Sequence, residues 1–205
     1  MEALTEPYTP YRSGSAMHLI HSNPQLYAGA GVGARSLRLQ GGREVRLRAA
    51  RPDDAPAVQQ FVRSLSEMSR RNRFFAPLRE LTPDQLDRVT RTTDPRELAL
   101  VAETFDGGEP RIVGLAQHAL CEPPNAEFAL VVGDDHQRKG IGMRMIGMLA
   151  DHAACAGVAA LVGFVRYDNW PMLTLLARLG FEFLNNEEPQ VIRVAKPLDA
   201  QGLAA

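Results

Sequence analysis

Six consecutive residues, Gln137-Arg138-Lys139-Gly140-Ile141-Gly142, combine two glycines with two basic side chains. They follow the apolar run 126–132, which is typical of a strand, and open a helical hydrophobic pattern that continues to about residue 156. Glycine costs about 1 kcal/mol against alanine within a helix, so two glycines at a helix start indicate that a ligand or another backbone approaches closely. A helix N-terminus binds phosphate through its unpaired N–H groups, and the basic pair adds positive charge. The segment predicts a pyrophosphate site; the alternative is a turn that only lets strand and helix pack.

Two common nucleotide motifs do not fit this segment. A Walker loop places lysine directly after its second glycine and then serine or threonine, whereas Lys139 precedes Gly140. A dinucleotide fingerprint requires a third glycine shortly after Gly142, where Met145 stands. The predicted phosphate therefore belongs to another kind of ligand.

Glu127 is the one charged residue in the apolar run 126–132. A buried, ionised carboxylate is costly unless it is paired or its pKa is raised, which makes Glu127 a candidate general base. A lysine amine of pKa about 10.4 must lose a proton before it attacks, at a cost of about 4.6 kcal/mol at pH 7. The alternative is a strand-end glutamate that faces water.

Hydrophobic periodicity predicts the elements that must position these residues. Strands are expected at 45–48, 98–102, 112–120, 126–132, 159–165, 181–184 and 191–194, with a hairpin turn at 106–108. One helix is expected to pack through Val58, Phe61, Val62, Leu65 and Met68, and further helices through 140–156 and 170–179. Thr82-Pro83-Asp84-Gln85 has the N-cap, proline and capping box of another helix start. Antiparallel pairs followed by a βαβ crossover predict an α/β (α+β) domain.

Composition narrows the class of protein. With 205 residues, 23 basic against 24 acidic side chains and 45% hydrophobic residues, the chain suits one soluble domain and not a dedicated nucleic-acid binder. Cys121 and Cys155 share no close spacing with each other or with histidine, so neither a disulfide framework nor a metal site is predicted. No long apolar run or signal peptide is found, and we expect a cytoplasmic protein. Residues 1–42 are predicted to be a loose extension, 43–198 the functional domain and 199–205 a tail.

The motif Gln137-x-x-Gly140-x-Gly142 resembles the signature of the GNAT acetyltransferases. Asn169, followed by Leu179-Gly180-Phe181, is similar to the second signature of that family, and the resemblance covers roughly residues 44–196. The segments 70–75, 78–81, 96–102 and 126–129 look like the catalytic domain of the bacterial Pat-type protein lysine acetyltransferases, which often carry an additional large module. The resemblance implies a GNAT fold, with a central mixed twisted sheet of about six to seven strands flanked by helices.

The resemblance also implies roles for individual residues. Acetyl-CoA is the expected acyl donor, its pyrophosphate held by Gln137, Arg138, Lys139, Gly140, Ile141 and Gly142. Backbone groups of Leu130, Val131 and Val132 should take the pantetheine arm as an added strand. Asn169 is placed near the pantetheine, although Asp168 and Asn169 serve equally well as helix N-caps. Glu127 falls at the position of the catalytic glutamate, while Leu176 stands where many members have an acid-donating tyrosine.

Other conspicuous residues have simpler interpretations. His136 is interpreted as a solvated loop residue, Trp170 as ordinary packing, and His118 and His152 lack the spacing of metal ligands. The basic cluster 70–73 is either a solvated helix end or a contact for an acidic protein surface. Three functions remain: acetylation of protein lysines, which is the leading hypothesis, acetylation of a small amine, and acyl-CoA sensing without turnover. The predicted partners are acetyl-CoA and an amine acceptor, with no nucleic acid or membrane, and a homodimer is compatible with the sequence.

Overall fold

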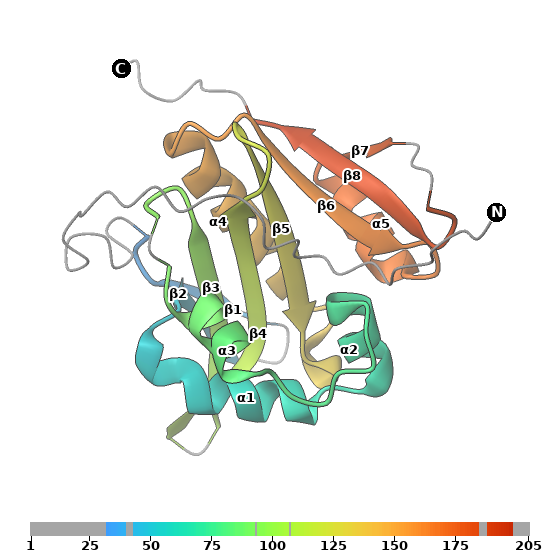
Figure 1. The fold of residues 1–205 in the computed structure, drawn as a ribbon. Helices are drawn as coiled ribbons and strands as arrows, with labels where there is room; N and C mark the ends of the chain where they lie inside the picture. The colour runs from blue at the N-terminus through green and yellow to red at the C-terminus, as the bar shows by residue number, and fades with distance from the viewer. Residues whose placement is uncertain (1–31, 40–42, 93, 107, 185–187, 199–205) are drawn as a thin grey trace.

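The computed structural model describes residues 32–39, 43–92, 94–106, 108–184 and 188–198, and in these ranges the chain forms one eight-stranded mixed sheet (Figure 1). The strand order is β1-β2-β3-β4-β5-β6-β8-β7. The strands are β1 (Arg35–Arg38), β2 (Glu44–Ala49), β3 (Leu98–Asp106), β4 (Glu109–Leu120), β5 (Asn125–Val132), β6 (Ala160–Arg166), β7 (Glu182–Leu184) and β8 (Val191–Pro197). The α-helices are α1 (Ala55–Ser64), α2 (Glu67–Phe74), α3 (Pro83–Thr90), α4 (Ile141–Cys155) and α5 (Trp170–Arg178).

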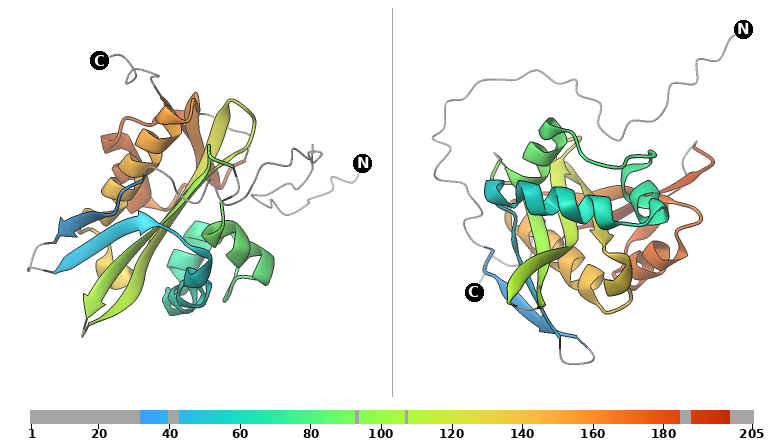
Figure 2. Two further views of the ribbon diagram at one scale, coloured as in Figure 1. Left: turned by 90° about the vertical axis from the view of Figure 1, so that its left-hand side faces the viewer. Right: turned by 90° about the horizontal axis from the view of Figure 1, so that it is seen from below.

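Helices cover both faces of the sheet. Figure 2 shows α1, α2 and α3 on one side, with α4 and α5 on the other. The α1 and α3 side buries a cluster that includes Val62, Val89, Leu115 and Val131. The α4 side buries a larger cluster around Met145, and alternate residues of each strand supply the two cores. The face of the sheet that a strand residue occupies therefore decides which group of helices it meets.

The sheet opens between β5 and β6. These strands are parallel and pair only over Asn125–Glu127 with Ala160–Val162, whereas β5 stays paired with β4 along Ala126–Val132. From Phe128 onward the two strands diverge, as their lower ends in Figure 1 show. The β5 edge over residues 128–132 consequently has no neighbouring strand, which leaves a gap between the backbones of β5 and β6 beyond Glu127.

The predicted α/β class is confirmed, as are most elements, although three expectations are wrong. The single early helix is two helices, because Ser66 accepts a hydrogen bond from the Ser69 N–H and thereby N-caps α2. Met68 is 57% exposed and does not belong to the packed face. Arg35–Arg38, within the segment predicted to be loose, pairs with β2 and makes an eighth strand. Residues 1–31 and 199–205 of the predicted extension and tail lie outside the described residues.

A charged network fixes the first long strands. The Glu103 side chain is 2% exposed and forms ion pairs with Arg46 and Arg48. Arg48 also donates two hydrogen bonds to Asp54, at 2.7 and 2.8 Å. The network ties β2 and β3 to the turn that precedes α1, and thus fixes the helices of that face against the sheet.

Candidate active site

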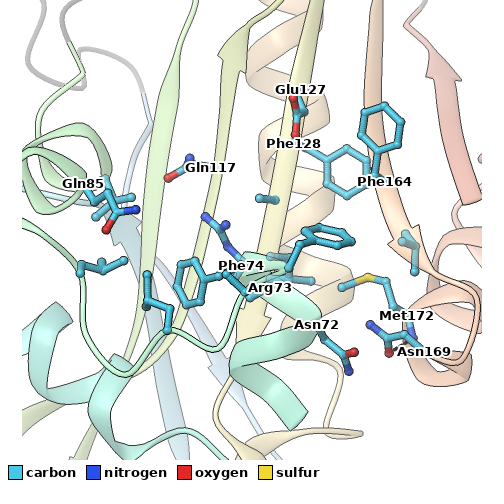
Figure 3. A pocket seen from close by; sticks show the side chains of 18 of the residues that line it. Asn72, Arg73, Phe74, Gln85, Gln117, Glu127, Phe128, Phe164, Asn169 and Met172 are labelled. Atoms are coloured by element: carbon cyan, nitrogen blue, oxygen red, sulfur yellow. Dashed lines mark hydrogen bonds between the residues drawn. The ribbon is translucent and has the colours of Figure 1, made fainter. Parts of the chain in front are cut away.

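A cavity of about 390 Å³ lies where the sheet opens. Its walls come from α2, α3, the loop between them, β4, β5, β6 and the start of α5 (Figure 3). Apolar residues make up much of the lining, namely Phe74, Phe75, Ala76, Leu78, Leu81, Val89, Phe128, Ala129, Leu130, Phe164, Val165 and Met172. Because Phe128 and Leu130 belong to the α4-side core, the cavity reaches through the gap from one face of the sheet toward the other.

Glu127 lines this cavity at the last residue pair before the strands diverge. Its neighbour Phe128 points to the α4 side, so the glutamate faces α2 and α3. Burial raises the pKa of the Glu127 carboxyl, and the positive charge of Arg73 partly offsets that rise. A buried carboxylate whose pKa moves toward neutrality can accept a proton from an amine, as the sequence predicted for a general base.

The polar part of the cavity wall faces Glu127. Figure 3 shows the Arg73 side chain reaching from α2 toward the strands, and Gln117 projecting from β4 beside β5. The Arg73 guanidinium carbon also lies 4.9 Å from the centre of the Phe74 ring. The predicted basic cluster is thus divided: Arg71 is exposed, Arg70 donates a hydrogen bond to the Leu65 carbonyl, and only Arg73 enters the cavity.

The predicted phosphate segment forms the turn into α4. Gly140 is the N-cap residue, with a φ of 83°, a conformation that favours glycine. No side chain caps this helix, so the N–H groups of its first turn are available to an anion. A Cβ on Gly142 would lie 3.1 Å from Leu130 and 3.3 Å from Leu175, so this glycine permits close packing of α4 against β5 and α5. Both interpretations of the two glycines therefore have a structural counterpart.

The remaining residues of the segment differ in their surroundings. The Gln137 amide donates hydrogen bonds to the Val132 carbonyl at 3.1 Å and to the Ser69 hydroxyl at 3.2 Å. Its side chain therefore holds the loop against β5 and α2, which leaves backbone groups for a ligand. Arg138 and Lys139 are exposed, and Lys139 donates a hydrogen bond to the Asp135 carbonyl. Ile141 is buried in the core behind the helix start.

The residues expected along the pantetheine arm lie at the open end of β5 and at the start of α5. Leu130 lines the cavity, Val131 is buried toward α1 and α3, and Val132 is partly buried at the end of β5. Asn169 is the N-cap of α5, because its Oδ1 accepts a hydrogen bond from the Met172 N–H. It also lines the cavity, and its contact with the pantetheine arm stays a prediction.

Other candidates lie outside the cavity. His118 and His152 meet on the α4 side with 3.0 Å between Nε2 and Nδ1, and burial lowers the pKa of His118 to about 4. His136 is partly buried in a small separate pocket, so its interpretation as a solvated residue is wrong. Trp170 is 71% exposed, so its interpretation as packing is wrong as well. Leu176 is fully buried in the core.

Within the described ranges no cluster of three or more metal-binding side chains occurs, and no helix is long and apolar enough to cross a membrane.

Sequence reasoning missed Gln117, which lines the cavity from β4. The sequence does contain a signal, because the polar Gln117 directly follows the apolar run from Ile112 to Ala116, much as Glu127 is the polar residue in its own strand. What the sequence did not show is that these two strands pair so that both side chains face the same helices.

The site suits acetyl-CoA on three structural grounds. An uncapped helix N-terminus with adjacent basic residues fits the pyrophosphate. The unpaired β5 edge offers backbone groups to the amides of the pantetheine arm. The gap beside Glu127 leads from this edge into the cavity, where the thioester would meet an acceptor.

Comparison with known proteins agrees with this geometry. Residues 44–182 match the family model described as Acetyltransferase (GNAT) domain. Acetyltransferase PA5475 of Pseudomonas aeruginosa is 31% identical over 144 residues, which cover 70% of this chain and 77% of that protein.

Solved structures agree at the level of the fold. The crystal structure of the GNAT domain of S. lividans PAT matches with a TM-score of 0.72 at 24% identity, covering 80% of this chain and 97% of that one. The structure of yncA, a putative acetyltransferase from Salmonella typhimurium with its cofactor acetyl-CoA, matches with a TM-score of 0.61 at 18% identity, covering 78% and 96%. The family model and the curated relative together show that this chain belongs to the GNAT acetyltransferase family and is an acyltransferase.

Proposed function

We propose that the chain is an acetyl-CoA-dependent N-acetyltransferase that uses Glu127 as its general base, and that its acceptor is a lysine side chain of a protein. The observation that carries the proposal is the position of Glu127, a partly buried carboxylate in the cavity at the point where β5 and β6 separate. This is where an acyl donor lying along the open β5 edge would meet an acceptor entering from the α2 and α3 side.

The chemistry of the cavity wall supports an aliphatic primary amine. On the α2 and α3 side, Phe74, Leu78 and Leu81 form an apolar wall, while the opposite wall holds a carboxylate and an amide. A lysine side chain has the matching form, with a four-carbon apolar stem that ends in an ammonium group. The resemblance to Pat-type enzymes points to the same acceptor.

In this proposal, Glu127 takes a proton from the acceptor ammonium, directly or through one water molecule. Burial favours this step because it raises the carboxyl pKa, which makes the carboxylate a stronger base, and the positive charge of Arg73 partly offsets that rise. Bound acetyl-CoA supplies the activated acetyl group. The amine nitrogen bonds to the acetyl carbon as the carbon–sulfur bond breaks, CoA departs as a thiolate, and the second proton passes from the nitrogen to that thiolate or to water.

The lining of the cavity favours direct attack by the amine over an acyl-enzyme. Among the described residues that line it there is no cysteine, serine, threonine, lysine, histidine or tyrosine that could take up the acetyl group. Cys121 and Cys155 are free thiols, but neither lines the cavity, and we propose a reducing, cytoplasmic setting for them. Transfer is therefore proposed to occur in one ternary complex.

A small amine is the second candidate acceptor. The observation that favours it is the cavity volume of about 390 Å³, within the range of sites that hold small molecules. Both candidates use the same base and donor, so only the acceptor assay separates them.

The test follows CoA thiol release and lysine acetylation by mass spectrometry, using purified protein, acetyl-CoA and a deacetylase-treated cell lysate. Glu127→Gln is expected to lower acetyl transfer about 10²- to 10⁴-fold at pH 7. The residual rate should rise about tenfold per pH unit, because the variant depends on amine that is already neutral. Glu122→Gln makes the same substitution at an exposed loop position and should retain wild-type transfer.

Each outcome assigns a function. Acetylated lysines that depend on Glu127 support the protein acetyltransferase. Thiol release only with added small amines moves the assignment to the second candidate. Acetyl-CoA binding without any product indicates an acyl-CoA sensor, and full transfer by Glu127→Gln at every pH removes this residue from the mechanism.

A further inference from the structure

The side-chain amide oxygen of Gln117, Oε1, is buried without a hydrogen-bond partner, and Gln117 lines the cavity. Leaving a buried polar group unsatisfied costs roughly 1–3 kcal/mol, and most such groups in folded proteins have a partner. An orphaned acceptor atom that lines a binding cavity is explained if its partner belongs to a ligand. The ligand must then offer a hydrogen-bond donor at this point.

Strand pairing places Gln117 close to Glu127 on the sheet. Gln117 on β4 pairs with Ala129 on β5, while Ala119 pairs with Glu127. Since side chains alternate along each strand, Gln117 and Glu127 occupy the same face as diagonal neighbours. Figure 3 shows Gln117 at β4 and Glu127 at β5, both on the part of the cavity wall that the strands form.

An amine is the group that these two side chains can hold together. A neutral primary amine has two N–H donors and one lone pair; a donor such as the Arg73 guanidinium could bind only the lone pair, which the attack on the thioester requires, so the two N–H groups need acceptors. If Glu127 takes one N–H and the Gln117 carbonyl takes the other, the lone pair is left free to face the thioester. We infer that Gln117 is the acceptor-binding residue that orients the amine and selects primary over secondary amines.

The inference rests on the proposed function, because it assigns a second contact to the same acceptor site. A secondary amine keeps a single N–H, which Glu127 needs for proton transfer, and its alkyl substituent then lies against Gln117. Only the primary amine gains from the glutamine carbonyl. Removing that carbonyl should therefore affect the two amines differently, which a merely structural role would not do.

The experiment replaces Gln117 with methionine, which keeps the length of the side chain and removes the acceptor atom. The probes are a peptide with a single lysine and the same peptide with Nε-methyl-lysine, together with butylamine and N-methylbutylamine. The primary-to-secondary ratio of kcat/KM should fall about tenfold in Gln117→Met, equivalent to about 1.4 kcal/mol, the size of one hydrogen bond. The free variant should melt at or above the wild-type temperature, because an unsatisfied buried oxygen has been removed.

Asn72→Leu is the matched control. The Asn72 Oδ1 is likewise buried without a partner in the cavity wall, but Figure 3 shows this side chain on α2, away from Glu127. Its loss should leave the primary-to-secondary ratio at the wild-type value, whatever it does to the overall rate.

The possible results separate the two proposals. An active wild-type protein whose ratio is unchanged in Gln117→Met overturns the role of Gln117 and leaves the proposed function standing. A Gln117→Met protein that melts several degrees below wild type overturns the inference too, because the amide would then have an internal partner. Wild-type protein that releases no thiol with any of the four probes and acetylates no lysine in the lysate refutes the proposed function, and the role of Gln117 with it.

Discussion

Gly163 in β6 leaves the space that the Phe128 ring occupies beside the cavity. A Cβ added at Gly163 would lie 2.7 Å from Phe128 Cε1, and ordinary contact begins at 3.4 Å, so the ring would have to retreat by about 0.7 Å. Phe128 is 6% exposed and packs on Phe181 with 5.1 Å between ring centres. Phe181 limits movement of the ring on one side, and the cavity that Phe128 lines offers space into which the ring can move.

Gly163→Ala should therefore weaken both the fold and the donor site. Overpacking of this kind costs about 1–3 kcal/mol, which lowers the Tm of a domain of this size by roughly 2–12 °C. If binding must push the ring back, the same strain weakens acetyl-CoA binding by up to roughly 100-fold. Differential scanning calorimetry and isothermal titration with acetyl-CoA measure the two effects.

Two comparisons test the reasoning. Gly147→Ala makes the same change inside α4, where no atom lies within 4 Å of the new Cβ, and should stabilise the protein by about 0.5–1 kcal/mol with unchanged binding. In the double variant with Phe128→Leu, the cost of Gly163→Ala should largely disappear, giving a coupling energy of about 1–3 kcal/mol. Additive effects, or a Gly163→Ala protein as stable as wild type, would refute the clash.

Three further outcomes are expected. Arg73→Gln removes the charge that lowers the pKa of Glu127, so the acid limb of the pH–rate profile should move to higher pH. A kcat/KM profile whose acid limb stays at the same pH would contradict the electrostatic interaction between Arg73 and Glu127. Glu103→Leu removes the ion pair of Arg46 and leaves Arg48 with Asp54 alone, and should destabilise by about 3 kcal/mol, seen as a fall of roughly 6–12 °C in the Tm by circular dichroism. Tyr167→Phe should not change the alkaline side of the profile, since this exposed tyrosine does not line the cavity; a lost alkaline limb would identify it as the proton donor.

The order of elements around the site was predictable because its signals are local. The apolar run 126–132, the glycines at 140 and 142 and the helical period after them lie within 30 residues of one another. Their structural counterparts are β5, the left-handed N-cap at Gly140 and α4. Glu127 was found in the same way, because one charge in an apolar strand is visible without any knowledge of its neighbours.

The break between α1 and α2 depends on a residue far away in the sequence. Asp134 accepts hydrogen bonds from the Ser66 N–H at 2.9 Å, from the Ser66 hydroxyl at 2.7 Å and from the Ser69 hydroxyl at 2.8 Å. A carboxylate at the N-terminus of α2 also interacts favourably with the helix dipole. These contacts start a new helix where the hydrophobic period alone continued the old one.

This long-range contact also explains how the two halves of the site come together. Asp134 follows the open end of β5, and Gln137 of the same loop reaches Ser69 on α2. The loop that prepares the start of α4 for an anion therefore also anchors the helix that carries Arg73 into the cavity. In the proposed mechanism, donor and acceptor approach Glu127 from opposite faces of the sheet, where β5 and β6 pair over only three residues. Direct transfer needs both substrates present at once, and this shared loop couples the geometry of one side to that of the other.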